Sequence, residues 1–394
     1  MKLLIPGSLL TFCTIPGAWF MAPLNAILGR RPTMVISAIL TIFGWLAVAL
    51  MPGSIGILVG RAISGIAAGG ISVSVNTYGI EMADPEVRGL MSIIINNGIL
   101  AGQVVTMGLG YGLRYYGVAL VNLFLPLMFL ISQIWLPESP SFLVVKGREA
   151  QARKVLMHLR GSSANTDMEV KKLKDMNQKD LGKSLAWREL FSRQSLKSGV
   201  IVTTLFILMH FTGYLVVSSN ASRIFANAGS SVDDGVAAII ICAVQLCAGV
   251  GAGFLIDRLG RKKSLMLSNA IMCIPLAILA TYVGVVNTEG DEVQTYGWIP
   301  LACLMISQAG VAVGVNPVPY ILSSEYFPTS IRSQASSICY TFGTLAGVAA
   351  LQLYTPMLEG MTQTGLYAFY ACVCALGILF AYFVVRETKG ELVG

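Results

Sequence analysis

Long runs of uncharged, apolar residues are the feature of this sequence that most restricts its fold. The stretches 33–50, 118–136, 200–217 and 235–256 carry no charge. Each has about the 20 residues that a helix needs to cross roughly 30 Å of hydrocarbon. A helix of a soluble protein would instead show one apolar stripe and a polar opposite face. Only 12% of the residues are charged, against about 25% in ordinary globular proteins. The sequence therefore predicts an integral membrane protein made of helices.

Eleven stretches are predicted to span the membrane. Their ranges are 5–27, 33–51, 55–78, 91–112, 115–136, 198–219, 235–256, 264–286, 297–322, 333–355 and 364–385. The first does not resemble a cleaved signal peptide, because its apolar run is too long and ends at Gly29-Arg30-Arg31 without a small-residue cleavage pattern. Because the number of spans is odd, the two ends of the chain are predicted to lie on opposite sides of the membrane.

Basic residues alternate between the loops of this topology. One set of loops carries Arg30, Arg31, Arg88, the segment 137–197, the segment 258–263, Arg332, Arg386 and Lys389, and the other set carries little beyond Lys2, Arg114 and Arg223. Lys and Arg are enriched in cytoplasmic loops, so the basic set is predicted to be cytoplasmic, with the C-terminus inside and the N-terminus outside. This pattern accounts for the net charge of +7. The lipid bilayer is therefore an expected partner, and nucleic acid is not.

The polar segment 137–197 divides the spans into two groups, five before it and six after it. We predict an N-terminal transmembrane bundle over 1–136, a cytoplasmic linker over 137–197 and a C-terminal six-helix transmembrane bundle over 198–394. Amphipathic pieces at 149–159 and 168–176 predict short helices of the linker at the membrane surface.

Short motifs recur in corresponding loops of the two groups. Gly29-Arg30-Arg31 in the first group corresponds to Gly260-Arg261-Lys262 in the second. Glu81 followed by Arg88 corresponds in the same way to Glu325 followed by Arg332. Two halves with matching loop motifs are typical of transporters built from parallel repeats.

Together these motifs resemble those of the sugar porter family of the major facilitator superfamily, in particular its insect facilitated trehalose transporter-like branch. The resemblance runs along nearly the whole chain, through Gly60-Arg61 with Gly65 and Gly69, Glu81 with Arg88-Gly89, 137–141, Gly147-Arg148, 257–262, 317–319, 325–328 and 387–390. It implies an all-α membrane protein with the major facilitator fold of two helical bundles. The chain begins where the second helix of the family begins. We therefore expect a fragment that lacks the first family helix, the alternative being a true protein of about eleven spans.

Charged residues at the interior ends of the spans are candidates for a gating network. Helix ends offer unsatisfied backbone groups and partial charges that such side chains can bind. The candidates are Arg30, Arg31, Glu81 and Arg88 in the first half, and Asp257, Arg258, Arg261, Glu325 and Arg332 in the second. The network is expected to hold the outward-open state and to break when the halves rock, a role that the resemblance also implies. The alternative is that these charges only set the topology.

A neutral polyol needs amide and hydroxyl groups and an aromatic face in its binding site. The candidates for substrate binding are Asn96, His210, Gln245, Asn316 and Tyr320. The resemblance implies that Asn96 replaces a sugar-binding glutamine, that Gln245 occupies a polar position facing the sugar, and that Tyr320 replaces a tryptophan.

The same comparison shows departures from the family pattern. Two consecutive glutamines correspond to Met209 and His210, an asparagine corresponds to Leu215, and an Asn-Trp pair corresponds to Gly343-Thr344. Each lost hydrogen bond removes about 0.5–1.5 kcal/mol, so hexose binding in the family manner is expected to be weakened. His210 is interpreted either as a substrate contact or as a hydrogen-bonded packing residue. Proton coupling is not expected.

The leading hypothesis is facilitated diffusion of a sugar of the trehalose or hexose type by alternating access. The alternatives are a carrier of a less polar solute and a non-transporting sensor or degenerate paralogue. The eight cysteines form no CxxC pair and the chain has only two histidines, so no metal, cofactor or disulfide framework is expected. Neither a catalytic triad spacing nor a phosphate loop is present, so an enzyme is not expected. The plasma membrane is the expected location.

Overall fold

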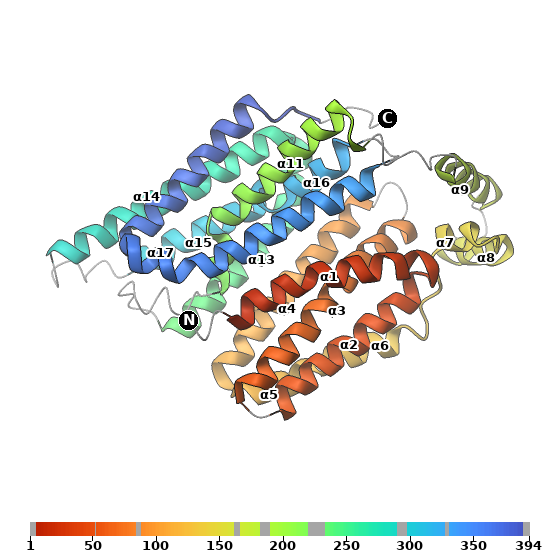
Figure 1. The fold of residues 1–394 in the computed structure, drawn as a ribbon, viewed down its shortest axis with the longest axis horizontal. Coiled ribbons are helices and arrows are strands. Elements are labelled where there is room, and N and C mark those ends of the chain that lie inside the picture. The colour runs from red at the N-terminus through yellow and green to blue at the C-terminus, as the bar shows by residue number, and fades with distance from the viewer. Residues whose placement is uncertain are drawn as a thin grey trace. The chain divides into compact units, whose positions relative to one another are not determined.

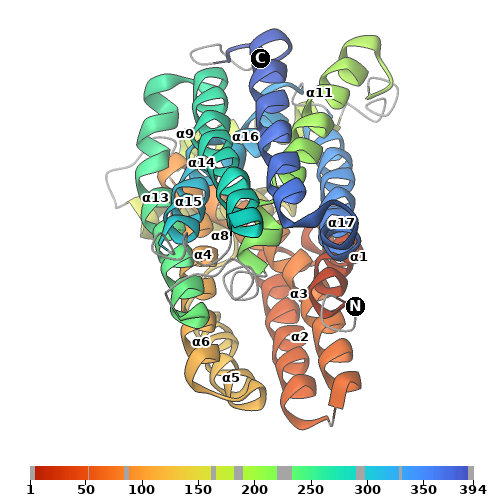
Figure 2. The same ribbon diagram turned by 90° about the vertical axis from the view of Figure 1, so that its left-hand side faces the viewer.

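The computed structural model describes residues 5–51, 53–83, 88–160, 166–181, 190–219, 233–289, 298–327 and 331–388. These residues are helical or in short connections, and they contain no strand. They divide into two compact units. Figures 1 and 2 show the chain coloured by residue number, from red at the N-terminus to blue at the C-terminus. The N-terminal unit comprises the described part of 5–95 and 113–187, and the C-terminal unit comprises that of 96–112 and 188–394.

The N-terminal unit is centred on α3 (Gly53–Met82), which packs against both α1 (Ile5–Ile27) and α2 (Arg30–Leu50). Glycines allow this close approach. A Cβ atom at Gly69 would lie 2.6 Å from the backbone nitrogen of Ala18 in α1, and one at Gly60 would meet Gly44 and Val48 of α2. The same unit holds the first part of α4 (Arg88–Gly112), α5 (Tyr115–Asn122) and α6 (Phe124–Ser132).

Three short helices after α6 pack around a small apolar core. They are α7 (Pro140–Val145), α8 (Glu149–Arg160) and α9 (Thr166–Leu181), and they are seen together in Figure 1. Their core consists of Leu143, Val144, Ala152, Leu156 and Val170. The helices predicted at 149–159 and 168–176 are thereby confirmed, both being somewhat longer than predicted.

The C-terminal unit contains the second group of long helices. They are α11 (Arg193–Phe211), α13 (Asp234–Leu259), α14 (Arg261–Glu289), α15 (Ile299–Gly310), the π-helix η2 (Val311–Val315), α16 (Pro317–Glu325) and α17 (Arg332–Phe383). In the described residues α14 packs against α15, η2 and α17.

Nine helices of the described residues are long and apolar enough to cross a membrane. The last of them, Gln334–Phe383, covers all but three residues of the last two predicted spans. The predicted span 91–112 lies on α4, which is not among the nine. The prediction of a membrane protein with many spans therefore holds for the described residues, whereas the count of eleven is not confirmed.

Several predicted spans contain a break in the helix, although Tyr115–Ser132 and Ile299–Ser323 each still form one candidate span. The stretch 115–136 holds two helices, α5 and α6. The stretch 198–219 breaks after α11, where Gly213 has φ 82°, and helix resumes at 214. The stretch 297–322 contains η2. The last two spans follow each other in α17 without a loop, and they are separated by a kink at Thr362, which has φ 63°. At Gly213 and at η2 the break lies against a neighbouring helix, a contact that hydropathy does not register.

Candidate functional site

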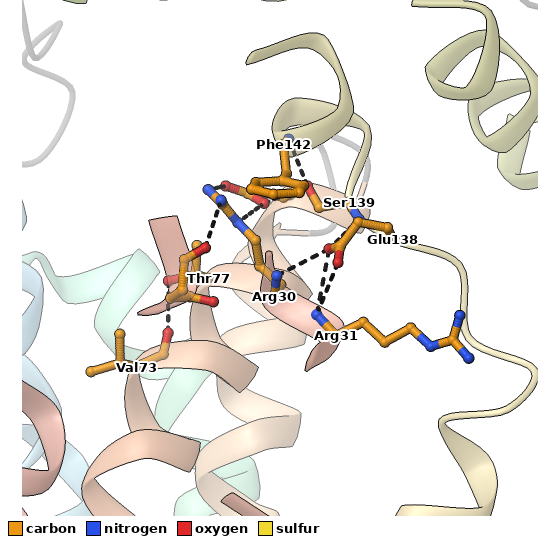
Figure 3. Close-up of polar contacts among 9 residues, drawn as sticks. Arg30, Arg31, Val73, Thr77, Glu138, Ser139 and Phe142 are labelled. Carbon is orange, nitrogen blue, oxygen red and sulfur yellow. Dashed lines mark hydrogen bonds and ion pairs between the residues drawn. The ribbon is translucent and has the colours of Figure 1, made fainter. Parts of the chain in front are cut away.

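Arg30 at the start of α2 forms a two-pronged ion pair with Glu81 at the end of α3. Its Nη2 lies 2.6 Å from Glu81 Oε1 and its Nε lies 2.9 Å from Oε2. The Ser139 hydroxyl, just before α7, also donates to Glu81. The Arg30 guanidinium lies 5.4 Å from the centre of the Phe142 ring, and Figure 3 shows the two side chains close together. The two charged side chains are 16% and 17% exposed, so the pair is largely shielded from water.

Glu138, next to Ser139, caps the N-terminus of α2. Its carboxylate accepts the backbone N–H groups of Arg30 at 3.1 Å and of Arg31 at 3.2 Å (Figure 3). A carboxylate is favourable there because a helix N-terminus carries unpaired N–H groups and partial positive charge. Gly29 makes room for it, having φ 108° and a position where a Cβ atom would lie 2.5 Å from Glu138 Oε2. Two acids thus fasten the segment 138–142 to the ends of α2 and α3.

The C-terminal unit repeats this arrangement with a different set of residues. Arg261 at the start of α14 pairs with Glu325 at the end of α16, its Nη2 and Nε lying 3.0 and 3.1 Å from Oε1. The Thr388 hydroxyl donates to Glu325 as Ser139 does to Glu81. Glu387 caps α14 by accepting the backbone N–H of Arg261 at 2.9 Å. Gly260, with φ 86°, makes room for Glu387 as Gly29 does for Glu138.

The structure therefore brings together four residues of the predicted gating network as two matching ion pairs. They are Arg30 with Glu81 and Arg261 with Glu325. Arg31 contributes its backbone N–H, and its side chain points away from the ion pair in Figure 3. Arg258 lies exposed in the last turn of α13. The side chains of Arg88, Asp257 and Arg332 lie outside the described part of the structure.

Sequence reasoning missed the third part of the repeat. Glu138-Ser139 and Glu387-Thr388 play equivalent roles, but they were not among the candidate site residues. A signal was present, since each pair is an acid followed by a hydroxyl residue after the last span of its half. Comparing the two halves beyond the first two loop motifs would have found it.

Three aromatic rings of the C-terminal unit lie close together. Phe206 of α11 lies edge-on to Tyr320 of α16, with ring centres 5.0 Å apart, and Tyr340 of α17 lies 6.0 Å from Tyr320. Phe206 is buried, whereas Tyr320 is 44% exposed. The exposed Tyr320 ring is therefore packed against two other rings. A ring in this position can cover the C–H face of a polyol.

His210 is buried at the seam between α11 and α17. Its ring stacks on Tyr214 at 5.8 Å between centres, and a Cβ atom at Gly347 would lie 2.9 Å from its Nδ1. One turn earlier, Phe206 occupies the corresponding place against Gly343. The side chains of Phe206 and His210 in α11 thus pack against two glycines of α17. His210 therefore packs against α17 in this structure, and both of its predicted roles, substrate contact and packing residue, stay predictions.

Two buried glutamines add amide groups to the same unit. Gln245 of α13 is 4% exposed and its Oε1 has no partner among the described residues. Gln308 of α15 is fully buried, and its Nε2 donates to the carbonyl oxygen of Tyr214 at 3.2 Å. Its Oε1 also lacks a partner among the described residues. Gln308 was not among the predicted residues, although an amide inside an apolar span is costly and marks a candidate site.

The two remaining candidates occupy different positions. Asn316 joins η2 to α16, and its backbone N–H donates to the Val311 carbonyl at 3.0 Å. Asn96 lies on α4 with an exposed side chain. The described residues contain no group of three or more side chains that could hold a metal ion. The eight cysteines are free thiols.

The chain resembles known proteins along almost its whole length. A family model described as "Sugar (and other) transporter" matches residues 4–393. The facilitated trehalose transporter Tret1 of Bombyx mori is 32% identical over 391 residues, which are 98% of this chain and 76% of that protein. Tret1 of Apis mellifera ligustica is 31% identical over a region that makes up 98% of this chain and 77% of that protein.

Solved structures share the fold. The partially occluded inward-open form of the xylose transporter XylE from E. coli has a TM-score of 0.82 at 22% identity, over 99% of this chain and 89% of that one. XylE bound to 6-bromo-6-deoxy-D-glucose has a TM-score of 0.78 at 23% identity, over 98% and 86% of the two chains.

The helices and the duplicated charge clusters define a multi-pass membrane carrier with the major facilitator fold. This chain belongs to the sugar transporter family. The predicted family, the all-α fold and a role as a carrier rather than an enzyme are thereby confirmed.

Proposed function

We propose that this protein carries a sugar of the trehalose or hexose type across the plasma membrane by facilitated diffusion, with its C-terminus in the cytoplasm. The observation that carries the proposal is the duplicated cluster of Arg30 with Glu81 and Arg261 with Glu325, in a chain of the sugar transporter family. Support for the sugar comes from the names of its relatives, which are facilitated trehalose transporters. No feature of the comparisons favours a less polar solute or a non-transporting role.

Alternating access requires contacts that hold one state and break in another. Each of the two clusters joins the start of one helix, the end of another and the chain segment that follows the last span, all within one half, so it would respond to shifts of these helices within that half. Such contacts are two-state elements whose equilibrium a substrate can bias. No cofactor enters the mechanism, since binding and rocking need no covalent chemistry.

Most of the proposed substrate contacts lie in the C-terminal unit. Tyr320 would cover an apolar face of the sugar, while Gln245 and His210 would bond its hydroxyls. Unpaired buried polar atoms cost about 1–3 kcal/mol each, and Gln245 Oε1 and His210 Nδ1 are two such atoms in the described residues. A hydroxyl donor would satisfy either. Asn96 and Asn316 remain proposed contacts on α4 and between η2 and α16.

The test is uptake of radiolabelled trehalose and glucose by proteoliposomes that hold the chain encoded by the complete transcript. We expect saturable uptake without a proton gradient, inhibited by unlabelled sugar. Tyr320→Ala should raise KM, whereas Tyr115→Ala should leave it unchanged, because Tyr115 is 54% exposed at the start of α5. Uptake of neither sugar above that of empty vesicles would refute the proposal.

A further inference from the structure

One serine of α14 forms hydrogen bonds with the backbone of the segment between α15 and α16. In η2 the helix widens, and the N–H of Asn316 donates to the Val311 carbonyl, five residues back, at 3.0 Å. The hydroxyl of Ser268 in α14 bridges the neighbouring pair of backbone groups. It accepts the N–H of Val315 at 2.8 Å and donates to the carbonyl of Gly310 at 2.6 Å. Helix kinks commonly arise where a side chain enters the backbone ladder in this way.

The bridge lies in a closely packed crossing of two helices. Ser268 is fully buried, and both of its hydrogen bonds are buried. A Cβ atom at Gly314 would lie 2.5 Å from the Ser264 carbonyl oxygen, and one at Gly310 would lie 2.9 Å from Ile271 Cγ2. The backbone of η2 therefore rests directly on α14 at both of its ends. Because the crossing excludes water, a lost hydrogen bond there cannot be replaced from solvent.

The bridge controls a residue of the proposed sugar site. Helix α16 begins at Pro317, and Tyr320 lies in its first turn, five residues after Val315. The path of η2 therefore decides where the Tyr320 ring lies relative to Phe206 and Tyr340, its two aromatic neighbours. A widened turn is a common device at functional sites in helices.

We propose that Ser268 is a positioning residue for Tyr320, acting through the backbone of η2 without touching the sugar. The inference rests on the proposed function for its link to sugar binding. The path of η2 is a property of the fold and can be measured without any sugar.

Ser264 provides a matched control within the same crossing. It lies on α14 one turn before Ser268 and is equally buried. Its hydroxyl has no partner among the described residues. Ser264→Ala and Ser268→Ala thus remove the same atom from neighbouring buried positions, and only the second removes hydrogen bonds to η2. Any general effect of deleting a buried hydroxyl appears in both variants.

The first measurement is hydrogen–deuterium exchange of peptides covering 311–320 in nanodiscs. We expect Ser268→Ala to speed exchange in this segment about tenfold, since loss of its two hydrogen bonds lowers the free energy of local opening of η2, and Ser264→Ala to leave it unchanged. The second is sugar binding and uptake. Ser268→Ala should raise Kd and KM about fivefold with little change in maximal rate. The same substitution should add nothing in a Tyr320→Ala background, because the residue that it positions is gone.

Equal exchange in the two serine variants would overturn the inference. So would a rise in Kd that persists in full when Tyr320 is absent, since Ser268 would then act on general stability. If the unaltered protein binds neither sugar, the proposed function fails and the link to sugar fails with it. The exchange measurement would still decide whether Ser268 sets the path of η2.

Discussion

Replacing Glu81 by Gln tests whether the charge cluster of the N-terminal unit holds its helices together. The glutamine keeps the shape of the side chain and removes its charge. Glu81 accepts two hydrogen bonds from Arg30 and one from Ser139, so all three bonds lose their charged acceptor. Arg30 is then left largely buried beside a neutral amide.

The expected loss follows from the burial of the pair. Removing one partner of a fully buried ion pair costs about 3–5 kcal/mol, because an unpaired charge stays behind. A fully exposed pair contributes about 0–1 kcal/mol. Arg30 and Glu81 are 16% and 17% exposed and meet in two-pronged geometry. We therefore expect Glu81→Gln to lower the free energy of unfolding by about 2 kcal/mol, which is roughly a thirtyfold change in the folded-to-unfolded ratio.

The assay is equilibrium unfolding in mixed micelles with increasing sodium dodecyl sulfate, followed by tryptophan fluorescence. Glu325→Gln should give a similar loss, because Glu325 makes the equivalent contacts with Arg261 and Thr388. The control is Glu149→Gln. Glu149 pairs with Lys174 at 2.8 Å, but the two side chains are 36% and 52% exposed, so no measurable change is expected.

A Glu81→Gln variant that unfolds at the same detergent fraction as Glu149→Gln would refute this reasoning. The cluster would then be an exposed surface pair in energetic terms, despite its burial. A loss for Glu325→Gln without one for Glu81→Gln would show that the two clusters share geometry but not energetic weight.

Three further predictions concern packing and pH. Gly260→Ala should lower the apparent melting temperature, because φ 86° strains an alanine by about 1 kcal/mol or more and its Cβ would lie 2.6 Å from a carboxylate oxygen of Glu387; an unchanged temperature would show that the cap is not needed. Gly347→Ala should destabilise by displacing His210, and the double variant with His210→Ala should recover part of the loss in the same thermal assay. Burial raises the pKa of Tyr326 above its ordinary value. The stabilisation of the folded state by neutral Tyr326 is therefore fully present below the unfolded-state pKa of about 10, and it is lost as pH rises through the folded-state pKa. Tyr326→Phe should remove this loss and flatten the alkaline end of a curve of stability against pH.

Hydropathy and short motifs predicted much of the fold because these signals are local. Span 5–27 was predicted with the bounds that α1 has, and the linker helices were found from their amphipathic pattern. The pairing of Arg30 with Glu81 joins residues 51 positions apart. It could be anticipated only because the second half repeats the same motif at Arg261 and Glu325. An internal repeat thus carries information about tertiary contacts that one half alone lacks.

The missed features depend on contacts between segments distant in sequence. The bond from Gln308 to the Tyr214 carbonyl crosses 94 positions. At the helix break, the ring of Tyr370 packs against Gly213, where a Cβ atom would lie 2.6 Å from Tyr370 Cδ2. No residue pattern around positions 213 or 308 announces these partners. The partners become visible only when the helices are packed.

The two clusters also differ in ways that bear on their role. Beside Arg30, the Phe142 ring of α7 adds a cation–π contact, so the linker helices help to hold the first cluster. Beside Arg261, the amine of Lys262 donates to the Tyr382 carbonyl at 2.7 Å, so the end of α17 helps to hold the second. The acids at 138 and 387 close both clusters by binding a helix N-terminus, whose partial charge does not depend on side-chain protonation. Because the caps and the ion pairs use separate carboxylates, each cluster can lose its ion pair while its cap holds the following segment in place. If the proposed cycle breaks and remakes these pairs, that division would keep their partners near enough to re-form.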